Sequence, residues 1–427
     1  MNFATRRSRR EFLRAGTASL AAATLGGGAA FAAAAPRVVV VGGGYGGATA
    51  AKYVRMWSAG KVDVTLVERN AEFVSCPLSN LVIGGNRSIT DITLAYDGLD
   101  KWGVRRVRDE AVAIDPVART VRTAGGATLA YDRLILSPGV DFMWDQIPSL
   151  DNAEAQTQIL HAWKAGPQTV ALRRQLEAMP DGGLFAIVIP MAPFRCPPAP
   201  YERACQVALY FQRAKPKSKV LILDANEEVQ SKKALFTAAW EGRYKGYVEY
   251  RPNSALVDVD VATRTAKFDF ETVEADVLNV IPPQFAGAIA RNLGMANANG
   301  RFCQVDFLTY ESTAQKSIHL LGDAIQVAPL MPKSGHMANQ HAKVCAAAIV
   351  ALLTGQAPNA APIVANTCYS YISDKEVVHV SSVHAYDAAQ KTMLVVPGSG
   401  GLSPAPSAEE GVFAEGWARN IWADMLG

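Results

Sequence analysis

Three of the six cysteines lie in stretches that could present a reactive sulfur. Cys196 stands in a proline-rich segment after an apolar run, Cys368 follows a Pro/Ala-rich linker, and Cys76 closely follows a second apolar run. We expect all three in loops. A thiolate can open a disulfide or be released from one, so two such residues beside an electron acceptor could relay a pair of electrons. Their spacing does not pair them, and a structural disulfide or free thiols would also fit.

The other three cysteines have an ordinary structural explanation. Cys345 lies in an apolar stretch with helical character, Cys205 follows Glu202 on a predicted helix, and Cys303 precedes a predicted strand. Free cysteine behaves as a small apolar side chain in such places. We therefore expect these three thiols to be buried.

A glycine loop that begins at residue 42 has the spacing of a dinucleotide-binding site. The β-branched run 37–41 predicts a buried parallel strand, and the residues after the loop open a helix. Glycines there permit the tight turn, the close approach of a pyrophosphate and the packing of helix on strand. A second predicted strand, 62–67, ends in an acid that can bind a ribose. The expected dinucleotide-binding residues are Gly42, Gly44, Gly47, Glu68 and Arg69.

Two later segments favour FAD over NAD as the dinucleotide. Residues 131–139 resemble the strand and turn that close the FAD domain in the two-dinucleotide flavoprotein family. Residues 318–324 resemble the second FAD signature of that family, which implies that Asp323, after Gly322, binds the ribityl chain. An enzyme that binds only NAD has no use for this second strand end.

The place of a second nucleotide loop is taken by an unsuitable sequence. The strand predicted at 184–189 is followed by a loop, 190–203, that is rich in proline instead of glycine. Proline offers no N–H to a phosphate and cannot adopt a positive φ. A strand predicted at 219–224 continues the α/β pattern. We infer that this domain has lost its NAD pocket, so that NAD(P)H is not the reductant.

The bulk properties describe a globular protein of ordinary charge. At 427 residues the chain is long enough for two or three domains. Five arginines and one glutamate lie in residues 1–35, so the remainder is nearly neutral, and this balance does not suit a nucleic-acid-binding protein. No metal site is predicted, and the lack of a Cys-x-x-Cys-His motif argues against a covalent c-type haem on this chain.

Residues 1–35 resemble a twin-arginine export signal. Arg9 and Arg10 precede a weakly apolar run of alanine and glycine with small residues suited to cleavage. This run is too weak to span a bilayer stably, and no later segment has eighteen uninterrupted apolar residues. We predict a periplasmic protein without stable membrane insertion.

Four motifs together carry a family resemblance. They are Phe-Val-Ser-Cys-Pro-Leu-Ser-Asn at 73–80, Phe-Arg-Cys-Pro-Pro-Ala-Pro-Tyr-Glu-Arg-Ala at 194–204, Met-Pro-Lys-Ser-Gly at 331–335 and Asn-Thr-Cys-Tyr-Ser at 366–370. With them the chain closely resembles, from Arg37 to its C-terminus, the flavoprotein subunit of flavocytochrome c sulfide dehydrogenase. A helix predicted to begin near Ser334 would bring its N-terminus and Lys333 to the reduced flavin, with Gly335 beside it.

The resemblance implies a role for several single residues. It implies that Cys76 forms a thioether with the flavin 8α-methyl group, and that Cys196 and Cys368 form a redox disulfide beside the isoalloxazine. Glu202 would be the nearby acid or base, against the plainer interpretation of a charge at a helix start. Trp417 would lie between flavin and haem, although a packed C-terminal aromatic fits as well.

The fold class expected from these patterns is α/β, with two Rossmann-like domains of glutathione-reductase type, a discontinuous FAD domain and a smaller C-terminal α+β domain. The expected divisions are residues 1–35 for the signal, 36–149 and 288–357 for the FAD domain, 150–287 for the second Rossmann-like domain, and 358–427 for the domain that contacts the cytochrome.

The function implied by the resemblance is oxidation of sulfide to sulfane sulfur or polysulfide, with electrons passed through FAD to a c-type cytochrome subunit in a heterodimer. One alternative is a sulfide:quinone oxidoreductase, which shares the two-domain plan but needs a quinone pocket. Another is a flavin-binding or sulfur-carrier partner protein without turnover. The export signal disfavours the first alternative, and the pair of cysteines disfavours the second.

Overall fold

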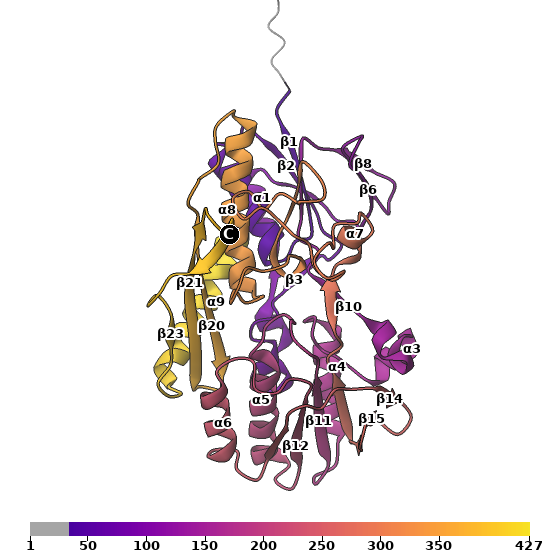
Figure 1. Ribbon diagram of the computed structural model, residues 1–427. Helices are drawn as coiled ribbons and strands as arrows, with labels where there is room; N and C mark the ends of the chain where they lie inside the picture. Colours follow the sequence, from indigo (N-terminus) through magenta and orange to yellow (C-terminus); the bar gives the residue numbers. More distant parts are fainter. Residues whose placement is uncertain (1–33) are drawn as a thin grey trace, which may run out of the picture. The chain divides into compact units, whose positions relative to one another are not determined.

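The computed structural model describes residues 34–427, and Pro36–Gly427 form one compact unit. The predicted signal, apart from its last two residues, lies outside the described residues. The unit contains three main sheets, each with its own helices (Figure 1).

The first sheet is parallel throughout and has the strand order β19-β9-β1-β2-β5. Its strands are β1 (Arg37–Val41), β2 (Asp63–Val67), β5 (Arg105–Val107), β9 (Arg133–Leu136) and β19 (Ile318–Leu320). Strand β19 comes from far along the chain and pairs with β9, so the first sheet is built from two separate segments, as the discontinuous FAD domain requires. Helix α1 (Tyr45–Trp57) follows β1 and packs against α8 (Gly335–Leu353), as both ribbon views show.

Smaller elements surround the first sheet. The antiparallel strands β6, β7 and β8 form one group, and β3 pairs with β4. Short helix α2 follows β3 and packs against α4 (Pro167–Ala178) and α5 (Ala199–Ala214). Their bounds are Glu72–Val74 for β3, Ser79–Ile83 for α2, Thr93–Ala95 for β4, Ala111–Asp115 for β6, Thr120–Thr123 for β7 and Thr128–Ala130 for β8.

The second sheet is also parallel, with the order β13-β12-β11-β17. Its strands are β11 (Leu184–Ile189), β12 (Lys219–Asp224), β13 (Val248–Arg251) and β17 (Val277–Val280). Strands β11 and β12 are buried apolar runs, which is typical of a parallel sheet covered on both faces. Helices α3 (Ala153–Gln158), α4 (Pro167–Ala178), α5 (Ala199–Ala214) and α6 (Lys233–Glu241) accompany it, with the antiparallel strands β14 (Asp258–Asp260), β15 (Thr265–Lys267) and β16 (Thr272–Glu274).

A two-stranded antiparallel link joins the regions of the two parallel sheets. Strand β10 (Val140–Phe142) leaves the first region, and β18 (Gln284–Ala286) returns to it ahead of α7 (Ala288–Arg291). Because the outgoing and returning strands pair with each other, the second sheet is inserted between them. The predicted domain boundaries at 149 and 288 fall close to this link and stay predictions.

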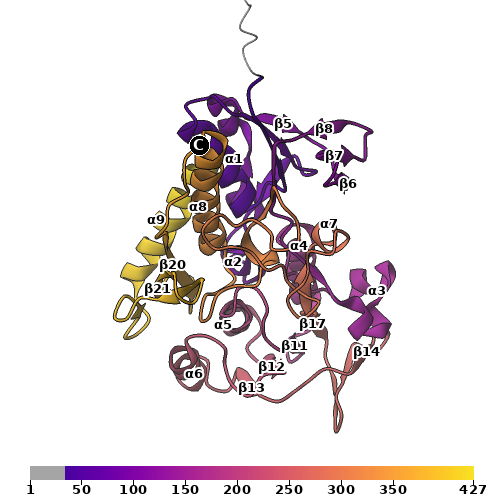
Figure 2. The same ribbon diagram turned by 45° about the horizontal axis from the view of Figure 1, so that its top comes forward.

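The C-terminal region is an antiparallel sheet covered by one helix. Strands β20 (Ile363–Tyr371), β21 (Val377–Asp387), β22 (Thr392–Val395) and β23 (Gly401–Leu402) form the sheet, and α9 (Ala408–Leu426) packs against β21 and α1. Figure 2 shows α9 beside α8 and α1.

The expectation that Cys368 lies in a loop is wrong. Cys368 lies inside β20 and is paired with Val380 of β21. The run Ile363–Tyr371 contains the β-branched and aromatic residues that favour a strand. The Pro/Ala-rich linker that precedes this run contains turn residues, whereas the run itself has strand character.

Candidate functional site

Two adjoining cavities run from the glycine loop toward the middle of the molecule, with volumes of about 510 and 350 Å³. Nearly all the cofactor-binding residues predicted from the sequence line one of them or both. These are Gly42, Gly44, Glu68, Arg69, Cys76, Gly322, Asp323, Lys333, Ser334 and Gly335. The strand ends of β1, β2 and β19 open onto the same space because parallel strands end at one edge of their sheet.

The glycine loop has the conformations that a dinucleotide site needs. Gly42 has a φ of +94°, which only glycine adopts without strain. No atom lies within 4 Å of the position that a Cβ on Gly44 would take, so this backbone faces the open cavity. Gly47 does not line the cavities, because it lies beneath the loop, where a Cβ would come within 1.8 Å of the Gly42 carbonyl oxygen. The third glycine therefore allows α1 to pack closely against the loop.

Glu68 and Arg69 lie where β2 ends. The Glu68 carboxylate accepts hydrogen bonds from the backbone N–H of Gly43 at 2.6 Å and of Asn70 at 2.8 Å. These bonds fix the acid against the loop with its edge on both cavities. Arg69 is largely exposed and pairs with Glu110 at 3.3 Å, so its contribution to the cavity is a rim charge.

Asp323 provides the sharpest test of whether a flavin fits. Its Oδ1 atom is buried and has no hydrogen-bond partner among the described residues, while Oδ2 lies 3.8 Å from an Arg195 nitrogen. A buried carboxylate oxygen without a donor is unfavourable, and a ribityl hydroxyl in the 350 Å³ cavity would satisfy it. The residues present therefore fit FAD.

Lys333 is buried, with only 4% of its surface exposed, so it is not a solvated surface lysine. Its ammonium donates hydrogen bonds to the backbone carbonyls of Asp323 and Ile325 and lies 3.6 Å from the centre of the Phe302 ring. Burial lowers the pKa of Lys333 to about 7. The lysine thus ties the Gly322–Asp323 turn to the start of α8, at the wall of the cavity.

Ser334 and His336 join the start of α8 to β20. The Ser334 hydroxyl caps the helix by accepting from the backbone N–H of Met337, and it donates to the Asn366 side chain at 2.7 Å. The His336 Nδ1 accepts from the backbone N–H of Thr367 at 3.0 Å. His336 is therefore an anchor for β20.

Cys76 occupies the loop between β3 and α2, as expected, and lines both the flavin-sized cavity and the cavity that contains the other two cysteines. Its sulfur accepts hydrogen bonds from Arg195 at 2.9 Å and from the backbone N–H of Ala165 at 3.4 Å. A cysteine at the junction of both cavities is placed for contact with one edge of a flavin.

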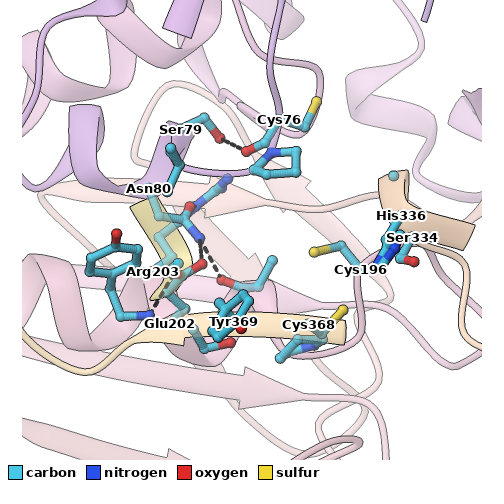
Figure 3. A pocket seen from close by; sticks show the side chains of 18 of the residues that line it. Cys76, Ser79, Asn80, Cys196, Glu202, Arg203, Ser334, His336, Cys368 and Tyr369 are labelled. Carbon is cyan, nitrogen blue, oxygen red and sulfur yellow. Dashed lines mark hydrogen bonds between the residues drawn. The ribbon is translucent and has the colours of Figure 1, made fainter. Parts of the chain in front are cut away.

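A third cavity, small and mostly apolar, brings Cys196 and Cys368 together with Glu202 (Figure 3). Cys196 comes from the proline-rich loop after β11, where its φ is +55°, and its N–H donates to the Lys333 carbonyl oxygen at 2.8 Å. Cys368 comes from β20. All six cysteines are free thiols in this structure, and the predicted burial of Cys205, Cys303 and Cys345 is confirmed.

Burial raises the pKa of both Cys196 and Cys368, and nearby charged groups also shift the pKa of each thiol. Proximity to Cys368 and Glu202 raises the Cys196 pKa further, while Arg195 and Lys232 act in the opposite direction. For Cys368, the strongest effect against burial comes from Lys232. Neutral forms of sulfur are thus favoured, and any anion formed here depends on the neighbouring cations.

Glu202 is a buried carboxyl in the first turn of α5. It accepts hydrogen bonds from the backbone N–H of Tyr371 and the side-chain amide of Asn80, both at 2.8 Å. Burial raises its pKa against the opposing effect of those hydrogen bonds. A carboxyl with a raised pKa beside two sulfurs can exchange a proton nearer neutral pH than an exposed glutamate can. The plainer view of Glu202 as an ordinary charge at a helix start does not fit its burial.

Two arginines of this site received no role from the sequence. Arg195 bridges Cys76, the Trp163 carbonyl and Asp323. Arg203 is 1% exposed, donates to Asn80, Asn279 and two carbonyl oxygens, and has a pKa lowered by burial to about 9. Both arginines lie in the motif 194–204 around Cys196, so the sequence alone could have indicated that they belong to the site. Only the fold reveals that they are buried.

Trp417 comes from α9 and lines the cavity that contains the two cysteines. Its ring centre lies 5.9 Å from that of His336 and 6.2 Å from that of Tyr369. The tryptophan therefore lies between the cysteine pair and the outer face of α9, which is the placement an electron path would need and also one that packing explains.

Three family models match the chain in sequence order. A pyridine nucleotide-disulphide oxidoreductase model covers residues 36–174, the central region of the sulfide dehydrogenase [flavocytochrome c] flavoprotein chain covers 169–282, and the flavin-binding region of flavocytochrome c sulphide dehydrogenase covers 360–426. These matches begin at the first described strand and extend through α9.

The curated relatives and solved structures point to the same fold. Mitochondrial sulfide:quinone oxidoreductases of Dictyostelium discoideum and Mus musculus are 24% and 23% identical over 65% of the chain, and the chain spans 63% of their length. The structure of a sulfide:quinone oxidoreductase from Aquifex aeolicus matches with a TM-score of 0.73 at 18% identity over 92% of each chain. An NAD-dependent persulfide reductase from A. fulgidus matches with a TM-score of 0.63 at 16% identity, covering 91% of this chain and 77% of that one. The predicted α/β fold class with Rossmann-like domains is confirmed.

Proposed function

Because this chain belongs to the family of flavocytochrome c sulfide dehydrogenase flavoproteins, we propose that it oxidises sulfide to sulfane sulfur and passes the electrons through FAD to a c-type cytochrome subunit. The observation that carries the proposal is that Cys196 and Cys368 line one cavity with Glu202, directly beside the cavity that fits a flavin. Sulfide would be the substrate and the Cys196–Cys368 disulfide its first oxidant.

The residues of the small cavity supply the parts of this reaction. Hydrosulfide opens the disulfide by attacking one sulfur while the other leaves as a thiolate, and no outside oxidant is needed for this step. Glu202 holds and releases the proton at its carboxyl oxygens, which its raised pKa favours. The apolar lining excludes water and so protects a reactive persulfide.

FAD supplies an acceptor of two electrons that can release them singly to a haem. The chain would hold it through the loop Gly42–Gly47, Glu68, the orphaned Asp323 oxygen and the turn at Ser334. We further propose a covalent link from Cys76 to the flavin. The position of the Cys76 sulfur at the junction of both cavities supports this link. Acid precipitation of the purified protein should then leave flavin fluorescence in the pellet.

A cytochrome acceptor is favoured over a quinone by the family to which the chain belongs, while the quinone-linked relatives keep the alternative open. Among residues 34–427, no helix is both long and apolar enough to cross a membrane. The C-terminal region with Trp417 would face the cytochrome. We also propose export to the periplasm by the twin-arginine route.

The deciding experiment compares two acceptors with the same purified protein. Sulfide-dependent reduction of a c-type cytochrome is expected to be much faster than that of decylubiquinone. The reverse order would replace the cytochrome proposal with a sulfide:quinone oxidoreductase. No reduction of either acceptor, and no bleaching of bound flavin by sulfide, would leave a flavin-binding or sulfur-carrier protein without turnover.

A further inference from the structure

A buried lysine that belongs to none of the four family motifs lies near the cysteine pair. Lys232 immediately precedes α6, has a φ of +56° and is only 6% exposed. Its ammonium donates to the Ser370 hydroxyl at 2.8 Å. No carboxylate of the described residues lies within 4 Å of this ammonium. A buried ammonium with a single neutral hydroxyl as its partner is costly unless an anion joins it.

The geometry of β20 brings this charge to one cysteine. Side chains two residues apart on a strand lie on the same face, about 7 Å apart along the strand. Cys368 and Ser370 are two residues apart, and the pairing of β20 with β21 is regular across both. Ser370 lines the small cavity beside Cys368. The Lys232–Ser370 pair therefore lies on the Cys368 side of the cysteine pair.

The two cysteines face different neighbours. Cys196 lines both the small cavity and the flavin-sized cavity, whereas Cys368 lines only the small one. Arg195, the cation adjacent to Cys196, already binds Cys76 and Asp323. Lys232 is thus the cation near the pair whose charge is left without a strong partner. An incoming sulfur anion would meet that charge at Cys368.

We propose that Lys232, acting through Ser370, is the positioning residue that holds anionic sulfur at Cys368, first the incoming hydrosulfide and then the persulfide anion that it forms. The inference rests on the proposed sulfide oxidation. Hydrosulfide forms a bond to the Cys368 sulfur, the bond between Cys368 and Cys196 breaks, and its electron pair leaves on Cys196 next to the flavin-sized cavity. The disulfide is reduced, the substrate sulfur is oxidised, and Glu202 takes the proton of the terminal sulfur.

Other charged groups near Lys232 and Cys368 set the background of any pH profile. Glu202 on α5, Glu410 on α9 and the Cys196 thiol all act on the Lys232 ammonium, whose pKa burial lowers. Glu202 opposes an anion at Cys368, and the Asn366 side chain supports one. A test must therefore compare variants at this lysine with the acid and the second cysteine unchanged.

The test measures the anion at Cys368 without sulfide. The flavin-loaded protein is reduced with a phosphine and treated with iodoacetamide between pH 6 and 10, and alkylation of Cys196 and Cys368 is followed separately by peptide mass spectrometry. In Lys232→Met we expect about tenfold slower alkylation of Cys368 near pH 7.5, which corresponds to a rise of about one unit in the pKa of this thiol. The effect at Cys196 should be smaller. Lys232→Arg should restore most of the rate.

Lys233→Met is the matched control, because Lys233 is the next residue of the chain but is exposed, and its ammonium pairs with Glu228 at 2.7 Å. An unchanged Cys368 profile in Lys232→Met, or the same shift in Lys233→Met, would overturn the inference. Ser370→Ala gives an independent reading if Lys232→Met fails to fold, and it should slow Cys368 alkylation as well. An unchanged profile in Ser370→Ala would then decide against the inference.

A kinetic measurement separates this inference from the proposed function. If the wild-type protein is not reduced by sulfide, the proposed function fails whatever the alkylation shows. If it is reduced, Lys232→Met should raise the KM for sulfide more than it lowers kcat, since the lysine holds the anion before the chemical step. If the lysine had only a structural role, Lys232→Met would lower thermal stability but would not raise the KM for sulfide more than it lowers kcat.

Discussion

At Cys196 and Cys368, replacing one atom, the sulfur, can test the proposed chemistry with little change to the packing. Replacing Cys196 with serine keeps nearly the same volume but removes the sulfur, so Cys196→Ser should still bind flavin and lose sulfide-dependent flavin reduction by at least about a hundredfold. Stopped-flow bleaching of the flavin absorbance measures this. Cys205→Ala, at a buried thiol outside the cavity, is the control and should retain the reduction rate. Ordinary reduction in Cys196→Ser would rule out the disulfide relay.

Glu202 makes a second prediction at the residue scale. A glutamine keeps the shape of the side chain but cannot exchange the proton, so turnover of Glu202→Gln should fall by about 10²- to 10⁴-fold while flavin stays bound. The pKa of Glu202 is raised by burial, so the wild-type rate should show an inflection above the ordinary carboxyl range. That inflection should be absent from the variant. A variant with the same inflection would assign the titration to another group.

At the scale of elements, the packing of α1 on the glycine loop is the most sensitive contact. Gly47→Ala would place a Cβ within 1.8 Å of the Gly42 carbonyl oxygen, so the helix or the loop must move. We expect most of the bound FAD to be lost, as measured by flavin absorbance per protein. Gly416→Ala is the matched control, because no atom lies within 4 Å of the position that a Cβ on this residue of α9 would take. This variant should keep its flavin, and its free energy of unfolding should rise by about 0.5–1 kcal/mol.

The elements that the sequence predicted well are those whose signal is local. The strands at 37–41, 184–189 and 219–224 were expected within the bounds that the structure gives, because each is a buried apolar run between turn residues. The strand that carries Cys368 was missed because a Pro/Ala-rich linker precedes it and because the polar residues Asn366, Thr367 and Ser370 interrupt its apolar pattern. Lys232 was missed for a different reason, since its partner Ser370 is remote in sequence and only the contact of α6 with β20 joins them.

At the scale of the whole molecule, the small cavity depends on three regions that meet there. Cys76 comes from the first region, Cys196 and Glu202 from the inserted second sheet, and Cys368 with Trp417 from the C-terminal region. None of these regions contains a complete reaction centre by itself. If the proposed reaction takes place in this cavity, the position of the C-terminal region is a condition for it, and the contacts that hold α9 on α1 and α8 serve that reaction as well as stability.

Asp424, near the end of α9, joins these three helices and offers a test of that docking. It accepts hydrogen bonds from Tyr53 of α1 and Asn339 of α8, and it pairs with Lys343 at 3.0 Å. Burial works to raise the pKa of Asp424, but these hydrogen bonds and the lysine outweigh it and hold the pKa below its ordinary value. The native state therefore binds this proton less tightly than the unfolded chain does. Its stabilising effect is present above the ordinary carboxyl pKa and is lost as the pH falls.

Asp424→Asn should lower the free energy of unfolding by about 1–3 kcal/mol at pH 7, because hydrogen bonds to a charged group are replaced by weaker ones. The difference from the wild type should shrink as the pH falls through the ordinary carboxyl pKa and below it, because the unfolded chain then takes up a proton that the native carboxyl binds less tightly. Denaturant titrations across this range measure it, with Asp145→Asn, at an exposed aspartate, as the control. If α9 docking positions the C-terminal sheet, the variant should also show slower Cys368 alkylation or turnover at pH 7 before it unfolds. A constant difference at all pH values would mean that the side chain acts by shape and not by charge.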